Sequence, residues 1–204
     1  MKIAIFGFGN VGRSLAKLFN NTGYDVMVCT QAGTSLASEY STASFAEGAA
    51  KAEVIVLAIP YQAAQEVLAP LTKTLAGKIV VDCTNPLNED WSPMLLGQEN
   101  SAAEEISRTV SESIVIKAFN TIFADVMPKE HHSRNGHLIT AFVAGDDISA
   151  KQIVLGLAQD IGFSPIDVGP LRMARFLEAM AHLNIQIALG QGGGTHTAFV
   201  YHQA

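Results

Sequence analysis

The stretch that decides the fold is Lys2-Ile3-Ala4-Ile5-Phe6-Gly7-Phe8-Gly9-Asn10-Val11-Gly12. It begins with a short apolar run, Ile3 to Phe6, of the length of a buried strand. Apolar side chains then recur at helical spacing between Asn10 and Asn21, and Gly23 marks the end of that helix. The glycine pattern G-x-G-x-x-G therefore lies in a turn between strand and helix, which is the context that gives this pattern its meaning.

Each glycine of the pattern has its own role. Gly7 permits the tight turn, Gly9 lets a pyrophosphate approach the backbone, and Gly12 lets helix and strand pack closely. The unpaired N–H groups and the partial positive charge at the helix start attract phosphate groups. The stretch therefore predicts a dinucleotide site. The simpler alternative is a strand, turn and helix whose glycines bind nothing.

Strands and helices alternate along the rest of the chain. Further strands are expected at residues 24–29, 54–59, 78–82, 114–118, 138–144 and 164–168. Helices are expected at residues 34–47, 61–75, 102–110, 149–161 and 171–189. Continuously apolar strands alternating with helices indicate a parallel sheet covered on both faces. The predicted fold is α/β, with a Rossmann-type, doubly wound, mainly parallel sheet in residues 1–144 and a small C-terminal helical and strand extension, residues 145–204, packed on the same sheet.

Composition argues against several classes of protein. Of the 204 residues, 49% are hydrophobic and 16% are charged, which argues against disorder. No apolar run approaches the roughly 20 residues that span a bilayer, and no signal peptide is recognised, so a cytoplasmic protein without a membrane partner is expected. The net charge of −6, without a basic stripe, argues against a nucleic-acid partner. Cys29 and Cys83 match no metal-binding spacing and are expected to be free thiols.

The end of the second strand bears on the choice of dinucleotide. An NAD site usually places an acidic residue about 20 residues after the glycines, where it accepts hydrogen bonds from the ribose 2′-OH. Here the strand ends in Cys29-Thr30-Gln31, with Thr34 and Ser35 close behind. Hydroxyl and amide groups donate to a 2′-phosphate that a carboxylate would repel, so NADP is favoured. The alternative is that Thr30 and Gln31 are ordinary turn residues.

Ligands of doubly wound sheets lie beyond the carboxyl ends of the strands. Here those ends, Ile59-Pro60-Tyr61, Asn85-Pro86 and Ala118-Phe119-Asn120-Thr121, carry apolar, amide and hydroxyl groups. They suit a flat redox ring held by packing, with Asn120 or Thr121 bonding a carboxamide or a ring carbonyl. Hydride transfer by positioning needs no acid–base dyad, so no catalytic residue is assigned. The alternative is that residues 118–121 merely turn the chain into the next segment.

Several charged and histidine side chains remain to be interpreted. His131, His132 and His137 lie in a polar stretch without cysteine, so a surface loop is expected there and no metal site is assigned. Lys117 ends a strand near the expected nicotinamide position and is expected to lie at the surface or beside a phosphate, with a catalytic lysine as the alternative. Arg172, Arg175 and Glu178 share one helix face; they are expected to form an ion-pair set, or else to anchor the acidic tail of a cofactor.

With these segments in view, nearly the whole chain resembles coenzyme F-420-dependent NADP oxidoreductases and their relatives, which include the cytosolic domain of six-transmembrane metalloreductases. The resemblance rests on Gly7 to Gly12, Ile59-Pro60-Tyr61, Val115 to Thr121, Ala144-Gly145-Asp146-Asp147, and Asp167 to Leu171 with Arg175 and Glu178. It implies hydride exchange between NADP and a small-molecule acceptor, a deazaflavin such as coenzyme F-420 or a flavin, and it implies a homodimer.

The resemblance also implies which residues touch the cofactors. The contacts to NADP would be made by Gly7, Phe8, Gly9, Asn10, Val11, Thr30, Gln31, Ile59 and Pro60, with Gly12 completing the glycine pattern. The segment Ala118 to Thr121 would lie where the two rings meet. One departure concerns Thr30-Gln31, because such proteins commonly carry Ser or Thr followed by Arg there.

Two rival functions remain. An imine or hydroxy-acid reductase shares this N-terminal domain, but such enzymes usually have a substantial helical domain after the sheet, and about 35 residues follow Gly169 here. A non-enzymatic NADP sensor would bind NADPH without oxidising it.

Overall fold

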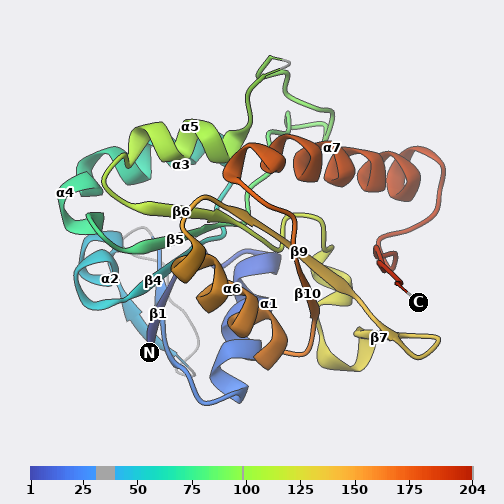
Figure 1. Ribbon diagram of the computed structural model, residues 1–204, viewed down its shortest axis with the longest axis horizontal. Helices are drawn as coiled ribbons and strands as arrows, with labels where there is room; N and C mark the ends of the chain where they lie inside the picture. The colour runs from blue at the N-terminus through green and yellow to red at the C-terminus, as the bar shows by residue number, and fades with distance from the viewer. Residues whose placement is uncertain (31–39, 98, 204) are drawn as a thin grey trace.

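The strand predicted at the start of the chain lies inside an eight-stranded sheet (Figure 1). The computed structural model describes residues 1–30, 40–97 and 99–203. In it, β1 (Lys2–Phe6) pairs in parallel with β2 (Asp25–Cys29) on one side and with β4 (Val54–Leu57) on the other. All but the first residue of β1 are buried, which explains why this strand is apolar on both faces.

The sheet has the strand order of a doubly wound dinucleotide-binding fold. Its order is β10-β9-β6-β5-β4-β1-β2-β3, and the six strands from β3 to β6 are all parallel. The remaining strands have the bounds β3 (Ser41–Ala43), β5 (Ile79–Asp82), β6 (Ile114–Lys117), β9 (Thr140–Gly145) and β10 (Ser164–Asp167). Among the described pairings of this sheet, only that of β6 with β9 is antiparallel. The α/β, Rossmann-type, mainly parallel fold is therefore confirmed.

Helices cover both faces of the sheet (Figure 1). One face packs against α1 (Asn10–Asn21) and α6 (Ile148–Asp160). The other packs against α2 (Phe45–Lys51), α3 (Tyr61–Leu68), α4 (Thr72–Leu75) and α5 (Ala102–Thr109), with the start of α7 (Ala174–Ile185). Within the described part of the chain, no helix has the length and apolar character needed to cross a membrane.

The expected helix at residues 34–47 is wrong where the structure describes it. Residues 41–43 form β3, and α2 begins only at Phe45. The cause is a capping box: the Ser44 hydroxyl accepts from the N–H of Glu47, and the Glu47 carboxylate accepts from the N–H of Ser44. A helix that starts at this cap cannot include the preceding strand.

The C-terminal part continues the same sheet. The expected boundary between the two parts of the chain, between residues 144 and 145, falls inside β9. After β9 the chain forms α6 and then β10, which pairs in parallel with β9. A short hairpin, β7 (Ser133–Arg134) and β8 (His137–Leu138), precedes β9, which begins two residues later than expected. The final segment returns to β9, because the Thr140 N–H donates to Phe199 O and the Thr140 hydroxyl accepts from Tyr201 N–H.

Candidate functional site

The glycine turn has the geometry that its sequence pattern requires. Gly7 has a φ of +98°, and a Cβ there would lie 2.4 Å from the carbonyl oxygen of Ala58. A Cβ on Gly12 would lie 2.2 Å from the carbonyl oxygen of Gly7, so helix and strand approach too closely for any side chain. Gly9 differs, because nothing lies within 4 Å of the position of its Cβ. Two glycines are thus needed for the fold, and the third leaves open space beside the backbone.

That open space lies at the start of α1, where an anion is favoured. Gly9 caps the helix without any side-chain hydrogen bond, and the first turn carries no acidic residue. The guanidinium of Arg13 lies 5.1 Å from the centre of the Phe8 ring and adds positive charge near the helix start. Unpaired N–H groups, the helix dipole and an open approach together fit a pyrophosphate.

The neighbouring strand ends complete this side of the site. Ile59 and Pro60 follow β4, and a methyl of Ile59 lies 2.7 Å from the position of a Cβ on Gly7. Thr30 follows β2 and is half-buried. Gln31, Thr34 and Ser35 lie outside the described residues, so the predicted contacts to a 2′-phosphate stay predictions.

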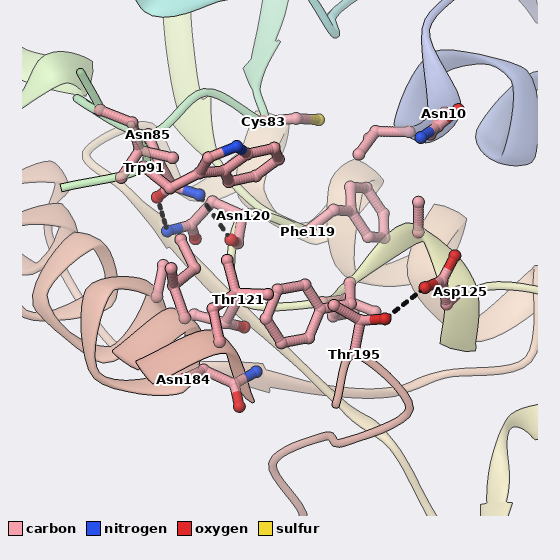
Figure 2. A pocket seen from close by; sticks show the side chains of 18 residues that line it. Asn10, Cys83, Asn85, Trp91, Phe119, Asn120, Thr121, Asp125, Asn184 and Thr195 are labelled. Atoms are coloured by element: carbon pink, nitrogen blue, oxygen red, sulfur yellow. Dashed lines mark hydrogen bonds between the residues drawn. The ribbon is translucent and has the colours of Figure 1, made fainter. Parts of the chain in front are cut away.

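A cavity of about 240 Å³ opens beside the start of α1 (Figure 2). Its walls come from α1, from the segments that follow β5 and β6, and from α7 with the turn behind it. It is lined by Asn10, Val11, Cys83, Asn85, Leu87, Trp91, Phe119, Asn120, Thr121, Ile122, Phe123, Ala124, Asp125, Ala181, Asn184, Ile185, Leu189 and Thr195. Asn10 and Val11 belong both to the glycine pattern and to this lining, so the cavity adjoins the anion-binding turn.

The four residues after β6 divide between the cavity and the core. Phe119, Asn120 and Thr121 line the cavity. Ala118 is fully buried among core side chains and is absent from the lining. Phe119 has a φ of +62°, an uncommon backbone conformation for an aromatic residue, and this bend turns the chain from the strand into the cavity wall.

Hydrogen bonds fix the orientation of Asn120. Its amide nitrogen donates to Asn85 Oδ1 at 2.9 Å and to the carbonyl oxygen of Leu177 at 3.1 Å, while Asn85 Nδ2 donates to the carbonyl oxygen of Asn120 (Figure 2). Both N–H groups of the Asn120 side chain are therefore used. Its Oδ1 is buried without a partner among the described residues, as is Thr84 Oγ1. Asn120 thus has an acceptor to offer and no donor, so it does not bond a ring carbonyl from this orientation.

Lys117 is fully buried, which corrects the expectation of a lysine at the surface or beside a phosphate. Its Nζ lies 2.9 Å from Asp82 Oδ2 and 2.8 Å from Glu178 Oε1, and it also donates to the carbonyl oxygen of Thr84. Burial alone would lower the pKa of Lys117, but the two carboxylates outweigh burial and raise it. The ammonium is therefore charged and joins β5, β6 and α7 behind the cavity wall.

The face of α7 does not form the expected ion-pair set. Glu178 binds Lys117 and accepts from the N–H groups of Ala102 and Ala103 at the start of α5. Arg175 pairs instead with Glu104, at 2.7 and 2.9 Å, and this pairing lowers the pKa of the Glu104 carboxyl. These contacts join α7 to α5 across the sequence, so they are tertiary contacts and not contacts along one helix.

His132 also departs from the expected surface loop. It is buried, stacks on Phe163 with ring centres 4.1 Å apart, and contacts the carbonyl oxygens of Met127 and Gly162 through its two ring nitrogens. Within the described ranges, no group of three or more His, Cys, Asp or Glu side chains is arranged to hold a metal. The histidine is a packing residue of the core.

Neither cysteine is suited to act as a nucleophile. Burial, with the charge of Asp82, raises the pKa of Cys83, although this side chain lines the cavity. Burial, with a contribution from Glu47, raises the pKa of Cys29 to about 12. Both thiols are therefore protonated at neutral pH.

Sequence reasoning missed part of the cavity. Trp91, Asp125 and Asn184 line it but belong to no motif. A signal for Trp91 existed, since it is the single tryptophan of the chain and stands in a polar loop. Asp125 and Asn184 gave no signal, because helix and turn residues of their kind are common at surfaces.

Several known proteins are similar to this chain in sequence and in architecture. Residues 2–86 match the family described as NADP oxidoreductase, coenzyme F420-dependent. The solved structure of a candidate F420-dependent NADP reductase from Arthrobacter sp. FB24 is 31% identical, with a TM-score of 0.89 and 100% of each chain covered. The chain belongs to this family of NADP-dependent oxidoreductases. The resemblance drawn from the sequence is therefore confirmed.

Relatives of the family differ in length from this chain. Metalloreductase STEAP3 of Rattus norvegicus is 30% identical over 182 residues, which are 88% of this chain and 36% of that protein. F420-dependent NADP reductase of Methanocaldococcus jannaschii is 30% identical over 144 residues, which are 68% of this chain and 63% of that protein. The chain thus spans less than two thirds of either relative. Pyrroline carboxylate reductase of Plasmodium falciparum, solved with NADP bound, is 15% identical with a TM-score of 0.62, which shows the fold alone.

Proposed function

We propose that the protein transfers a hydride between NADP(H) and the ring of a deazaflavin or flavin acceptor. The observation that carries this proposal is the double role of Asn10 and Val11, which belong to the glycine turn and also line the cavity. A dinucleotide whose phosphates lie at the start of α1 directs its nicotinamide end towards that cavity. Names of relatives agree, since they include F420-dependent NADP reductases and metalloreductases.

The residues present fit a dinucleotide. Gly9 leaves the space that a pyrophosphate needs, and the uncapped N–H groups of α1 point at it. Ile59 and Pro60 lie at the adjoining strand end, where the ribose and nicotinamide would pass. Bound NADPH supplies a hydride, and with it two electrons, to an acceptor ring that takes its balancing proton from solvent.

This chain contributes positioning and little proton handling. The cavity lining is mostly apolar, and Asp125 is the one carboxylate among the lining residues that the structure describes. Asp125 accepts a hydrogen bond from Thr195, and the Cys83 thiol is protonated. Hydride transfer demands that the reacting carbons approach to about 3–3.5 Å, which a rigid and dry wall favours.

The test is oxidation of NADPH, followed by its absorbance, with separate acceptors: coenzyme F-420, FMN, FAD, and a ferric chelate with and without flavin. Oxidation by a deazaflavin or a flavin supports the proposal. Tight NADPH binding without oxidation by any acceptor would show a sensor instead. Turnover only with a cyclic imine or a hydroxy acid would show the rival reductase.

We also propose that two copies associate through the outer face of α7. Phe176, Met180 and Leu183 recur at helical spacing on α7, and Ile187 follows in the turn Gln186–Gly190; Phe176, Leu183 and Ile187 are 62%, 54% and 44% exposed. Helices packed antiparallel about a two-fold axis place Phe176 of one copy opposite Ile187 of the other, so the stripe is self-complementary. The inner face of α7 lines the cavity through Ala181 and Asn184, which brings the association close to the site.

A further inference from the structure

Trp91 combines two features that are costly for a protein. Its φ of +67° lies in the left-handed region, which bulky residues rarely adopt. Its side chain is 56% exposed, although it lies over the mouth of an apolar cavity. In the described part of the chain, no aromatic side chain stacks on the indole, so one face of the ring is free of any aromatic partner from this chain.

A compact turn holds this conformation. The N–H of Trp91 donates to the carbonyl oxygen of Asn88, and the N–H of Asn88 donates to the carbonyl oxygen of Ser92. The side chain of Asn88 donates to Ser92 Oγ and to the carbonyl oxygen of Pro93, and Asp90 accepts from the N–H of Ser92. Strain that is held by so many bonds often marks a functional position.

The cavity beneath the indole has little charge. The described lining residues include no lysine, arginine or histidine, and the carboxylate of Asp125 lies at the Thr195 side of the cavity, away from Trp91 (Figure 2). The ring of Phe119 and the indole of Trp91 line the same cavity. Such a lining suits an uncharged aromatic ring and offers no cationic side chain to the anionic tail of a cofactor.

The size of the cavity agrees with that occupant. Its volume of about 240 Å³ is below the roughly 300–1,000 Å³ of sites that enclose a whole ligand. A cavity of this size has room for the ring end of a cofactor, with the rest of the molecule outside. An exposed indole at the mouth supplies a flat apolar face to such a ring.

We propose that Trp91 is the platform on which the tricyclic ring of a flavin or a deazaflavin stacks, and that this site recognises the ring and not its tail. The inference rests on the proposed function, because it assigns the acceptor of that reaction. Trp91 determines specificity by stacking and takes no part in proton transfer.

The chain provides its own probe, since Trp91 is the only tryptophan. Titration with riboflavin, 5-deazariboflavin, FMN and FAD, in the presence of NADP⁺, is expected to quench the intrinsic fluorescence in a saturable manner. Calorimetry should give the same dissociation constants. Affinities of riboflavin, FMN and FAD within about threefold of one another indicate recognition of the ring. A preference of more than tenfold for FMN or FAD would overturn that part of the proposal.

Trp91→Gly is the decisive variant, because glycine adopts a φ of +67° without strain and keeps the turn. It should weaken flavin or deazaflavin binding at least about fivefold, as expected for loss of an aromatic stack, and leave NADP⁺ affinity unchanged. Trp91→Phe should restore part of the loss. Leu95→Ala, at a 91% exposed position of the same loop outside the cavity, is the matched control.

The outcomes separate this inference from the function on which it rests. Native affinity for the ring in Trp91→Gly would overturn the platform, even where turnover with a flavin persists. Absence of both quenching and NADPH oxidation in the native protein would overturn the proposed function itself.

Discussion

Lys117 Nζ and Glu178 Oε1 lie 2.8 Å apart, although the residues are 61 positions apart in the chain and neither side chain is more than 5% exposed. Asp82 is the second carboxylate on the same ammonium. Glu178 also accepts from two N–H groups at the start of α5. One buried cation therefore fixes the position of α7 relative to β5, β6 and α5, and with it one wall of the cavity.

Lys117→Met is expected to destabilise the protein strongly. It leaves Asp82 and Glu178 buried without a counter-charge, which typically costs about 3–5 kcal/mol. Urea denaturation measures the loss. Lys2→Met, in the exposed pair with Asp25 at 3.3 Å, is the control and should change stability by less than about 1 kcal/mol. Equal losses in the two variants would contradict the structural role of the buried ammonium.

Gly9→Ala should lower dinucleotide affinity, whereas Gly12→Ala should lower the stability of the fold. A methyl on Gly9 meets no protein atom, so the fold should persist while dinucleotide affinity falls at least about tenfold, or about 1.4 kcal/mol. A methyl on Gly12 would lie 2.2 Å from Gly7 O, so this variant should lose stability. Calorimetric titration and thermal denaturation measure the two effects. Unchanged affinity in Gly9→Ala would exclude the pyrophosphate from this turn.

NADPH is expected to bind more tightly than NADH, because no carboxylate lies in the stretch Met27 to Gln31. The ratio should be modest in the native protein, since no arginine or lysine stands in that stretch. Gln31→Arg should widen it by adding a guanidinium that pairs with the 2′-phosphate. Titration of both variants with both coenzymes tests this, and a native preference for NADH would refute it.

Leu183→Glu should convert a dimer into a monomer, because it places a charge in the centre of the apolar stripe on α7. Sedimentation velocity measures the change. Ile153→Glu, at a 42% exposed position of α6, is the matched control and should leave the assembly unchanged. A native protein that sediments as a monomer at high concentration would count against the association.

Stability should fall as the pH drops below about 6.5, through His182. Burial lowers the pKa of His182, while its contact with the carbonyl oxygen of Pro86 and the charge of Glu178 act in the opposite direction. The unfolded chain then takes up a proton at a higher pH than the folded one, so the loss begins near pH 6.5 and ends below the folded pKa. His182→Gln should reduce this slope, measured as the free energy of unfolding against pH; an identical slope would contradict the assignment.

Local signals predicted most of the fold. The helix from Asn10 to Asn21 has the bounds that its apolar spacing indicated, and Gly7 and Gly12 occupy positions where a Cβ would clash. The start of α2 was also visible in principle, since Ser44 and Glu47 form a capping pattern three residues apart. Such features depend on neighbours in the sequence.

Long-range contacts set the parts that were not predicted. The partners of Lys117 lie 35 and 61 residues away, and no spacing within a strand or helix reveals them. The burial of His132 depends on Phe163 and Gly162, which lie about 30 residues further along the chain, just before β10. Ala118 was expected at the cofactor but belongs to the core. It still follows the direction of the strand, because the chain bends towards the cavity only at the next residue, Phe119.

The Cys83 thiol, set in the cavity wall with a raised pKa and 9% exposure, makes the site accessible to chemical footprinting. Alkylation requires the thiolate, and the raised pKa keeps Cys83 protonated. The Cys83 thiol should therefore react slowly with iodoacetamide at neutral pH while the cavity wall is closed. Cys29 is fully covered, with its sulfur packed beneath Gly48, and should react more slowly still. The rate at which the first label appears therefore reports how often the wall opens, and any molecule that fills the cavity should protect it.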